Sequence, residues 1–131
     1  MIADNVKKVF DENLWYVATC GEYLNVIPVG FKCVTDDGKF AMAAVMMSET
    51  CANIQANGKI AVNVCNPTTL ESYQVKGTAE FVTEGPVYDA FVKLCEDTFK
   101  GAMSTKCAVV ITPAKIINNG IGPNNGQEVE F

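Results

Sequence analysis

The sequence predicts one domain, built as a small antiparallel β-barrel with a few short helices. Three observations support this fold class. A chain of 131 residues, 49% of them hydrophobic, suits a single domain with its own core. About six segments have the short length and turn-bounded pattern of β-strands. The helical segments are isolated, without the regular strand and helix alternation of a doubly wound sheet. We therefore treat residues 1–131 as one domain.

The first half of the chain is predicted to begin with a helix and to continue in strands. Residues 4–13 place Val6, Val9 and Phe10 on one face behind Asp4 as the N-cap, which indicates a short amphipathic helix. Strands with alternating or apolar patterns follow over residues 14–21, 23–34 and 40–47.

The second half of the chain is predicted to hold two more helices among its strands. A short helix over 51–57 stops before a glycine, and a longer one over 83–100 has Pro86 near its start. Gly77 predicts a bulge, and the tail 118–131 has no periodicity. Strands are predicted over residues 59–65, 71–82 and 106–117. Two inward faces are predicted: Tyr73, Val75, Ala79 and Phe81 in the long strand, and Val87, Phe91, Leu94 and Cys95 in the longer helix.

Two small-residue features stand out in the second and third predicted strands. Pro28 cannot donate a hydrogen bond to a neighbouring strand, and Gly30 weakens a strand interior. They mark a bulge, a sheet edge or a place where something approaches the backbone. Ala41, Ala43 and Ala44 either leave room for a flat ligand or serve tight core packing.

Charge and composition exclude several classes of function. The net charge is −5, all cationic side chains are lysine, and there is no His, so a basic stripe for nucleic acid is missing. Without His the usual general base is missing, and we predict no catalytic residue. We find no targeting segment and no apolar run that spans a membrane, so we expect a cytoplasmic protein without membrane contact. Small-molecule binding, or chemistry carried by a cofactor, remains.

Six cysteines stand singly in the sequence, without a C-x-x-C pair. We expect reduced thiols that are buried as small hydrophobic groups, and no metal site. A weaker hypothesis concerns Cys51, which lies near the start of a predicted helix. Because a helix N-terminus lowers the pKa of a thiol, Cys51 is a candidate redox sensor.

Four phrases in this order resemble a known family: WYVATCGEYLNVIPV, SETCANIQANGKIAVNV, VKGTAEFVTEGPVYDAF and AVVITPAKI. The chain is similar to the FMN-binding split barrels related to pyridoxamine 5′-phosphate oxidase, especially to their small single-domain members. The resemblance implies a six-stranded antiparallel split β-barrel that forms a homodimer, with FMN in the clefts between the subunits. It also implies a small oxidoreductase or electron carrier that meets a redox partner protein or a small substrate.

The resemblance further implies which residues hold the cofactor. Two segments would face each other across the isoalloxazine ring: Pro28, Val29 and Gly30, and Ala43, Ala44, Val45 and Met46. The phosphate would meet Ser48, Glu49 and Thr50. Asn53 matches an asparagine that is frequent in the small helix of the family, where a structural role is the alternative.

Glu49 departs from the family pattern, which commonly has Lys or Arg beside the phosphate. A carboxylate a few ångströms from a phosphate dianion costs about 1 to 4 kcal/mol. Three alternatives stay open: Glu49 points to solvent, Lys32 or Lys76 supplies the charge, or no phosphate binds. Without Arg we do not expect pyridoxal phosphate chemistry. The alternative function is a split-barrel binding module that has lost FMN or binds a deazaflavin or haem.

A surplus of apolar residues gives the expected homodimer a physical reason. Several large apolar side chains exceed what one small barrel needs inside, namely Trp15, Tyr16, Phe31, Met46 and Met47.

Overall fold

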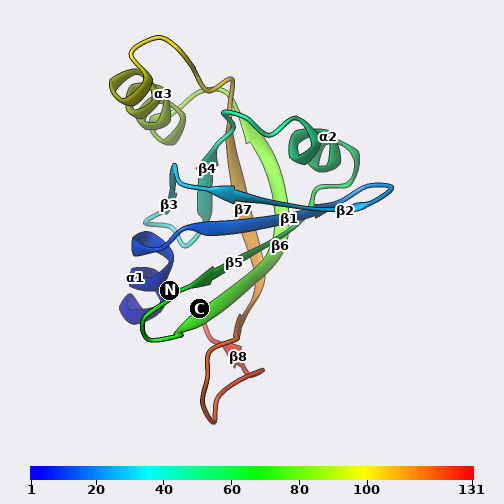
Figure 1. Ribbon diagram of the computed structural model, residues 1–131, viewed down its shortest axis with the longest axis vertical. Helices are drawn as coiled ribbons and strands as arrows, with labels where there is room; N and C mark the ends of the chain where they lie inside the picture. The colour runs from blue at the N-terminus through cyan, green and yellow to red at the C-terminus, as the bar shows by residue number, and fades with distance from the viewer.

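The protein is a curled antiparallel β-sheet with three helices packed around it, as a computed structural model describing residues 1–131 shows (Figure 1). Its helices are α1 (Asp4–Glu12), α2 (Ser48–Asn57) and α3 (Pro86–Phe99). The strands are β1 (Trp15–Cys20), β2 (Leu24–Val29), β3 (Lys32–Val34), β4 (Phe40–Ala43), β5 (Lys59–Cys65), β6 (Ser72–Val82), β7 (Ala108–Asn118) and β8 (Glu128–Val129). The mainly β, antiparallel fold class is confirmed. None of the helices is long and apolar enough to cross a membrane.

The sheet has eight strands, not the predicted six. The predicted strand over 23–34 is divided into β2 and β3, because the chain turns at Gly30 and Phe31. The second addition is β8, a two-residue strand in the tail that pairs with β7. The predicted strand over 40–47 is shorter, because the chain leaves the sheet after Ala43 and α2 already begins at Ser48.

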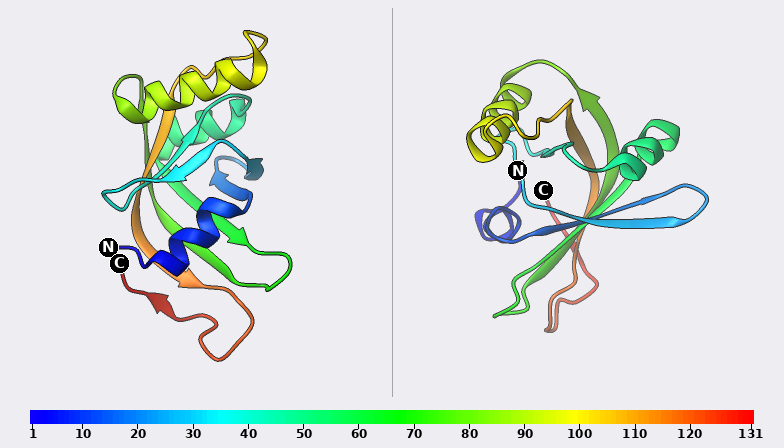
Figure 2. Two further views of the ribbon diagram at one scale, coloured as in Figure 1. Left: turned by 90° about the vertical axis from the view of Figure 1, so that its left-hand side faces the viewer. Right: turned by 45° about the horizontal axis from the view of Figure 1, so that its top comes forward.

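The ends of the sheet are brought together by the chain itself. The strand order is β2-β1-β5-β6-β7-β4-β3, so β2 and β3 lie at opposite ends although only Gly30 and Phe31 separate them. In a flat sheet each strand would add about 4.8 Å between these ends. The sheet therefore curls until β2, paired with β1, and β3, paired with β4, meet, and its curvature is visible in Figure 2.

Helix α1 packs into the curled sheet through an aromatic cluster. Val6, Val9 and Phe10 are buried, as predicted. The Phe10 ring centroid lies 4.8 Å from that of Phe40 and 6.0 Å from that of Trp15. Trp15 Nε1 also donates a hydrogen bond to the Phe10 carbonyl oxygen at 2.7 Å. Both apolar packing and a buried hydrogen bond thus hold α1 in place.

The bulge predicted at Gly77 is present, but two inward predictions are wrong. The pairing of β6 with β7 shifts register at Gly77, where a Cβ would overlap the Thr112 carbonyl oxygen. Leu94 is exposed because α3 contacts the sheet through Phe91 and Cys95 instead. Phe81 is exposed as well, in an open pocket beside α2.

The apolar surplus is smaller than predicted. Trp15 and Met47 are buried within the single chain, and Phe31 is half-buried. Tyr16 and Met46 are exposed, so the prediction of apolar surface holds for these two side chains. The difference arises because Trp15 packs against Phe10 of α1, Phe31 packs against Phe99 of α3, and Met47 is part of the main core.

Replacing Phe10 by Ala should lower the free energy of unfolding by about 3 to 5 kcal/mol, because a fully buried ring is lost from the main core. Ile121→Ala, at an exposed site, should change it by less than about 0.5 kcal/mol. Urea denaturation followed by circular dichroism measures both. Similar values for the two variants would mean that α1 is not part of the cooperative core.

Candidate functional site

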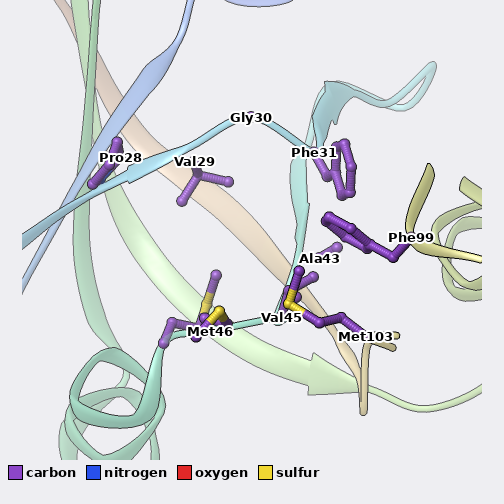
Figure 3. A pocket seen from close by; sticks show the side chains of 10 residues that line it. Pro28, Val29, Gly30, Phe31, Ala43, Val45, Met46, Phe99 and Met103 are labelled. Atoms are coloured by element: carbon purple, nitrogen blue, oxygen red, sulfur yellow. The ribbon is translucent and has the colours of Figure 1, made fainter. Parts of the chain in front are cut away.

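An apolar pocket of about 300 Å³ opens between the end of β2 and the segment that follows β4 (Figure 3). Its lining contains no charged or polar side chain: Pro28, Val29, Gly30, Phe31, Ala43, Val45, Met46, Met47, Phe99 and Met103. We call it the apolar pocket. It brings together most of the residues predicted to face a flavin ring, namely Pro28, Val29, Gly30, Ala43, Val45 and Met46. Their role in binding stays a prediction.

The walls of the apolar pocket follow from local chain geometry. Pro28 lies on β2, an edge strand that pairs with β1 only. The other side of β2 has no neighbouring strand, so proline, which has no N–H, costs no hydrogen bond there. A Cβ at Gly30 would meet only Leu14 Cδ1, at 3.9 Å, so the backbone there is open. Phe31 faces Phe99 of α3, with ring centroids 5.5 Å apart at 50° (Figure 3). Helix α3 thus closes one side of the pocket.

The small residues of β4 are explained largely by α3. Ala41 and Ala43 form a buried cluster with Ala108, Phe91 and Cys95. Small side chains on the sheet allow the helix to approach closely. Tight packing therefore accounts for Ala41, whereas Ala43 both packs against this cluster and lines the apolar pocket.

A second pocket, of about 560 Å³, adjoins the first and shares Val45 and Met47 with it. Its lining is Ala44, Val45, Met47, Ser48, Cys51, Gln55, Phe81, Thr83, Lys106 and Cys107. We call it the polar pocket because four of its ten lining residues, Ser48, Gln55, Thr83 and Lys106, have polar side chains, whereas the other six are hydrophobic. Lys106 is its only charged side chain.

Ala44 lies at the boundary of the two pockets and is held by hydrogen bonds to the chain before β7. Its N–H donates to the Cys107 carbonyl oxygen at 3.1 Å. The Thr105 hydroxyl lies 3.3 Å from the Ala44 carbonyl oxygen and 2.6 Å from that of Cys107. Thr105 is buried, so these bonds are shielded from water. The backbone predicted to carry a flavin ring is therefore fixed from behind.

The Ser48-Glu49-Thr50 motif is divided between the surface and the interior. Helix α2 begins at Ser48 and has no side-chain cap. Ser48 is exposed and lines the polar pocket. Glu49 is exposed and lines neither pocket, which agrees with the alternative in which its carboxylate points to solvent. Thr50 is fully buried.

Thr50 and Asn53 belong to a polar network that ties α2 to β1 and β2. Asn25 Nδ2 donates to Thr50 Oγ1 at 2.9 Å and lies 3.3 Å from Thr19 Oγ1. Asn53 Nδ2 donates to Thr19 Oγ1 at 3.1 Å. Asn53 also packs against Gly21, where a Cβ would overlap its side-chain oxygen. In this structure, then, both predicted site residues anchor α2 and line neither pocket.

The comparison with protein families decides what the chain is related to. The model of the family described as Pyridoxamine 5′-phosphate oxidase matches residues 2–119. The chain belongs to this family. The resemblance seen in the four sequence phrases is thereby confirmed.

The chain is also similar to individual proteins. An uncharacterized protein of Methanocaldococcus jannaschii is 34% identical over 95 residues, which are 70% of this chain and only 60% of that relative. HupZ of Group A Streptococcus is 31% identical, with a TM-score of 0.80 over 96% of this chain and 100% of that chain. An FMN-binding protein of Syntrophomonas wolfei has a TM-score of 0.76 at 17% identity, over 88% of this chain and 84% of that chain, and shows likeness of fold alone.

Lys32, one of the two lysines predicted to neutralise a phosphate, is engaged elsewhere. Its Nζ donates to the carbonyl oxygens of Phe10 and Asp11, each at 2.8 Å, at the end of α1. It also lies 5.6 Å from the centroid of the Trp15 ring. Burial lowers the pKa of the Lys32 ammonium below its ordinary value, although Asp11 acts in the opposite direction. This cation serves the packing of α1.

The other candidate, Lys76, lines a separate hollow on β5 and β6 together with Lys59. The cation beside the predicted site is Lys106. Neither Lys106 nor the pocket residues Phe99 and Met103 could be found from the sequence. They follow Asn53, the last predicted site residue, by more than forty positions and belong to no pattern that continues the site. They reach it only because α3 packs on β4 and β7 pairs beside β4.

All cysteines are free thiols in this member of the pyridoxamine 5′-phosphate oxidase family, and Cys51 and Cys107 both line the polar pocket. Burial raises the pKa of the Cys51 thiol, and the proximity of Cys107 adds to the effect. Burial raises the pKa of Cys107 as well. The expectation of a lowered Cys51 pKa is therefore wrong, which removes the reason for a redox-sensor role.

Replacing Thr50 by Val should lower the free energy of unfolding by about 1 to 3 kcal/mol, because the part-buried Asn25 amide loses its 2.9 Å acceptor. Ser48→Ala, two residues earlier and exposed, should be nearly neutral. Thermal and urea unfolding of the three proteins provide the comparison. Equal stability of Thr50→Val and wild type would contradict an anchoring role for this network.

Proposed function

We propose that the protein binds FMN, with the isoalloxazine ring in the apolar pocket, and works as a small oxidoreductase or electron carrier. One observation carries the proposal: residues 28–30 and the segment after β4 line the same uncharged opening. These are the two segments that the family resemblance assigns to the ring. Membership of the pyridoxamine 5′-phosphate oxidase family supports the same cofactor class.

The lining of the apolar pocket suits a flat, mostly apolar ring. Met46 and Met103 are flexible and polarizable, so they can adapt to an aromatic surface. Phe31 and Phe99 offer aromatic contacts, and Gly30 lets the ring approach the backbone. Backbone N–H and C=O groups of the lining can pair with the polar edge of the ring. These residues would bind and orient the cofactor and exclude water from it.

When bound, the flavin would supply the redox chemistry. No titratable side chain lines the apolar pocket, so we propose no catalytic residue. Protons would be exchanged with solvent or substrate. The chain has no Arg with which to hold pyridoxal phosphate, so we do not propose vitamin B6 oxidation. The electron donor or acceptor would be a redox partner protein or a small substrate, and the cytoplasmic location stays a prediction from the sequence.

Purified protein titrated with FMN should quench the fluorescence of the flavin and gain thermal stability. Val45→Asp should weaken binding at least tenfold, because it places a carboxylate in an uncharged pocket. Leu94→Asp, on the exposed face of α3, should bind as wild type does. Circular dichroism checks that both variants are folded.

The same titration separates the alternative cofactors. A deazaflavin or haem that stabilises the protein while FMN does not would replace FMN in this proposal. A protein that responds to none of the three would be a split-barrel module without these cofactors. Normal FMN binding by Val45→Asp would place the ring outside the apolar pocket.

We also propose that the protein forms a homodimer with the cofactor in clefts between the subunits. The β1–β2 hairpin has an apolar outer face: Leu24 is 87% exposed and Val26 is 63% exposed. Tyr16 and Pro28 are directly opposite each other on this face. At the mouth of the apolar pocket Met46 is 80% exposed. A second subunit would cover such surface, which single domains rarely leave in water.

Sedimentation equilibrium should give about twice the chain mass of 14.1 kDa. Leu24→Asp should shift the protein to monomers, because a charge would be buried against the partner. Ile121→Asp, at a similarly exposed apolar residue outside the hairpin, should leave the dimer intact. A wild-type monomer would contradict the shared cleft.

A further inference from the structure

The polar pocket continues the apolar pocket past Val45 and Met47, and it carries a single charge, that of Lys106. We propose that the polar pocket is a phosphate monoester subsite and that Lys106 is the residue that binds the phosphate. The inference rests on the proposed flavin function. It assigns the cofactor phosphate to a lysine two residues before β7, whereas the sequence motif assigned it to Ser48, Glu49 and Thr50.

The backbone of Lys106 is fixed relative to the proposed ring site. Its neighbours on both sides contact Ala44: the Thr105 hydroxyl approaches the Ala44 carbonyl oxygen at 3.3 Å, and the Cys107 carbonyl oxygen accepts from the Ala44 N–H at 3.1 Å. Ala44 directly precedes Val45, which both pockets share. A ligand with its ring over this segment would therefore have Lys106 within reach of its tail.

Lys106 is free to receive an anion. It is exposed, and its ammonium group makes no ion pair or hydrogen bond within the chain, whose one salt bridge joins Lys115 to Glu128. Most cations of the chain lie away from this pocket, including Lys32 at the end of α1 and Lys76 in its own hollow. Lys106 is the one lysine that lines the polar pocket, and its ammonium group is unpaired.

The rest of the polar pocket fits a phosphate as well. Side chains of Ser48, Gln55 and Thr83 can donate hydrogen bonds to phosphate oxygens. No acidic side chain lines the pocket, and Glu49 lies outside it. An anion there would therefore meet one cation and several hydrogen-bond donors, without a carboxylate in the lining.

Riboflavin, which is FMN without the phosphate, isolates this subsite. Wild type should bind FMN more tightly than riboflavin. Lys106→Gln should reduce that preference roughly tenfold while leaving riboflavin affinity unchanged, because a charge-assisted contact is lost only with the phosphorylated ligand. Lys93→Gln, an exposed lysine on α3, should keep the wild-type preference. Fluorescence titrations of the three proteins with both ligands give the dissociation constants.

Salt and pH provide independent readouts. The preference for FMN should fall with added salt, because the contact is solvent-exposed. It should also fall as the pH is lowered through about 6, where a phosphate monoester dianion takes up a proton. Both dependences should be weaker in Lys106→Gln than in wild type. A merely structural role of Lys106 would move neither.

Three outcomes would overturn the inference, and each differs from failure of the proposed function. Equal wild-type affinity for FMN and riboflavin would mean that the protein does not recognise the phosphate. An unchanged FMN preference in Lys106→Gln would place the phosphate elsewhere. A larger gain in FMN preference from Glu49→Gln than the loss from Lys106→Gln would put it over the first turn of α2. If wild type binds neither ligand, the flavin function itself fails.

Discussion

The short link between the two ends of the sheet constrains the whole molecule. Val29 ends β2 and Lys32 begins β3, yet these strands are the first and last of the sheet order. Three steps along the chain span at most roughly 11 Å. The sheet must curl to satisfy this limit, which brings the end of β2 and the start of β3 together at Gly30 and Phe31. Gly30 and Phe31 both line the apolar pocket, so the constraint that shapes the barrel also places this pocket.

The segment after β4 connects the fold with the proposed chemistry. Ala43 packs under α3, and Ala44 belongs to the main core and is bonded to the chain around Thr105. Val45 and Met46 then face the open pocket. The short side chains of Ala43 and Ala44 pack inside the protein. The side of the segment that faces the proposed ligand is formed by backbone atoms and apolar side chains. A rigid support of this kind reduces the ordering cost of binding a flat ring.

This chain differs from the family pattern in the charged residues that could meet the cofactor phosphate. The hydroxyl and amide of Thr50 and Asn53 are engaged with Asn25 and Thr19, which leaves them little capacity for a ligand. The protein has a net charge of −5 and no Arg, so an anionic cofactor depends on few cations. The position of a lysine relative to the proposed ring site then matters more than the number of lysines in the chain. Lys106 contributes because the chain around it is bonded to the floor of the proposed ring site.

The fold class, the bulge at Gly77, the buried face of α1 and the family could be predicted from the residues alone, because periodicity, turn residues and motif order are local or sequential signals. The division of 23–34 into two edge strands, and the roles of Phe99, Met103 and Lys106, were decided only by the tertiary structure. Those residues reach the pockets because α3 packs on β4 and β7 pairs beside β4. No local pattern records a contact between segments so distant in the chain. The same reason explains Thr50, whose hydroxyl could be assigned to packing only once Asn25 was seen beside it.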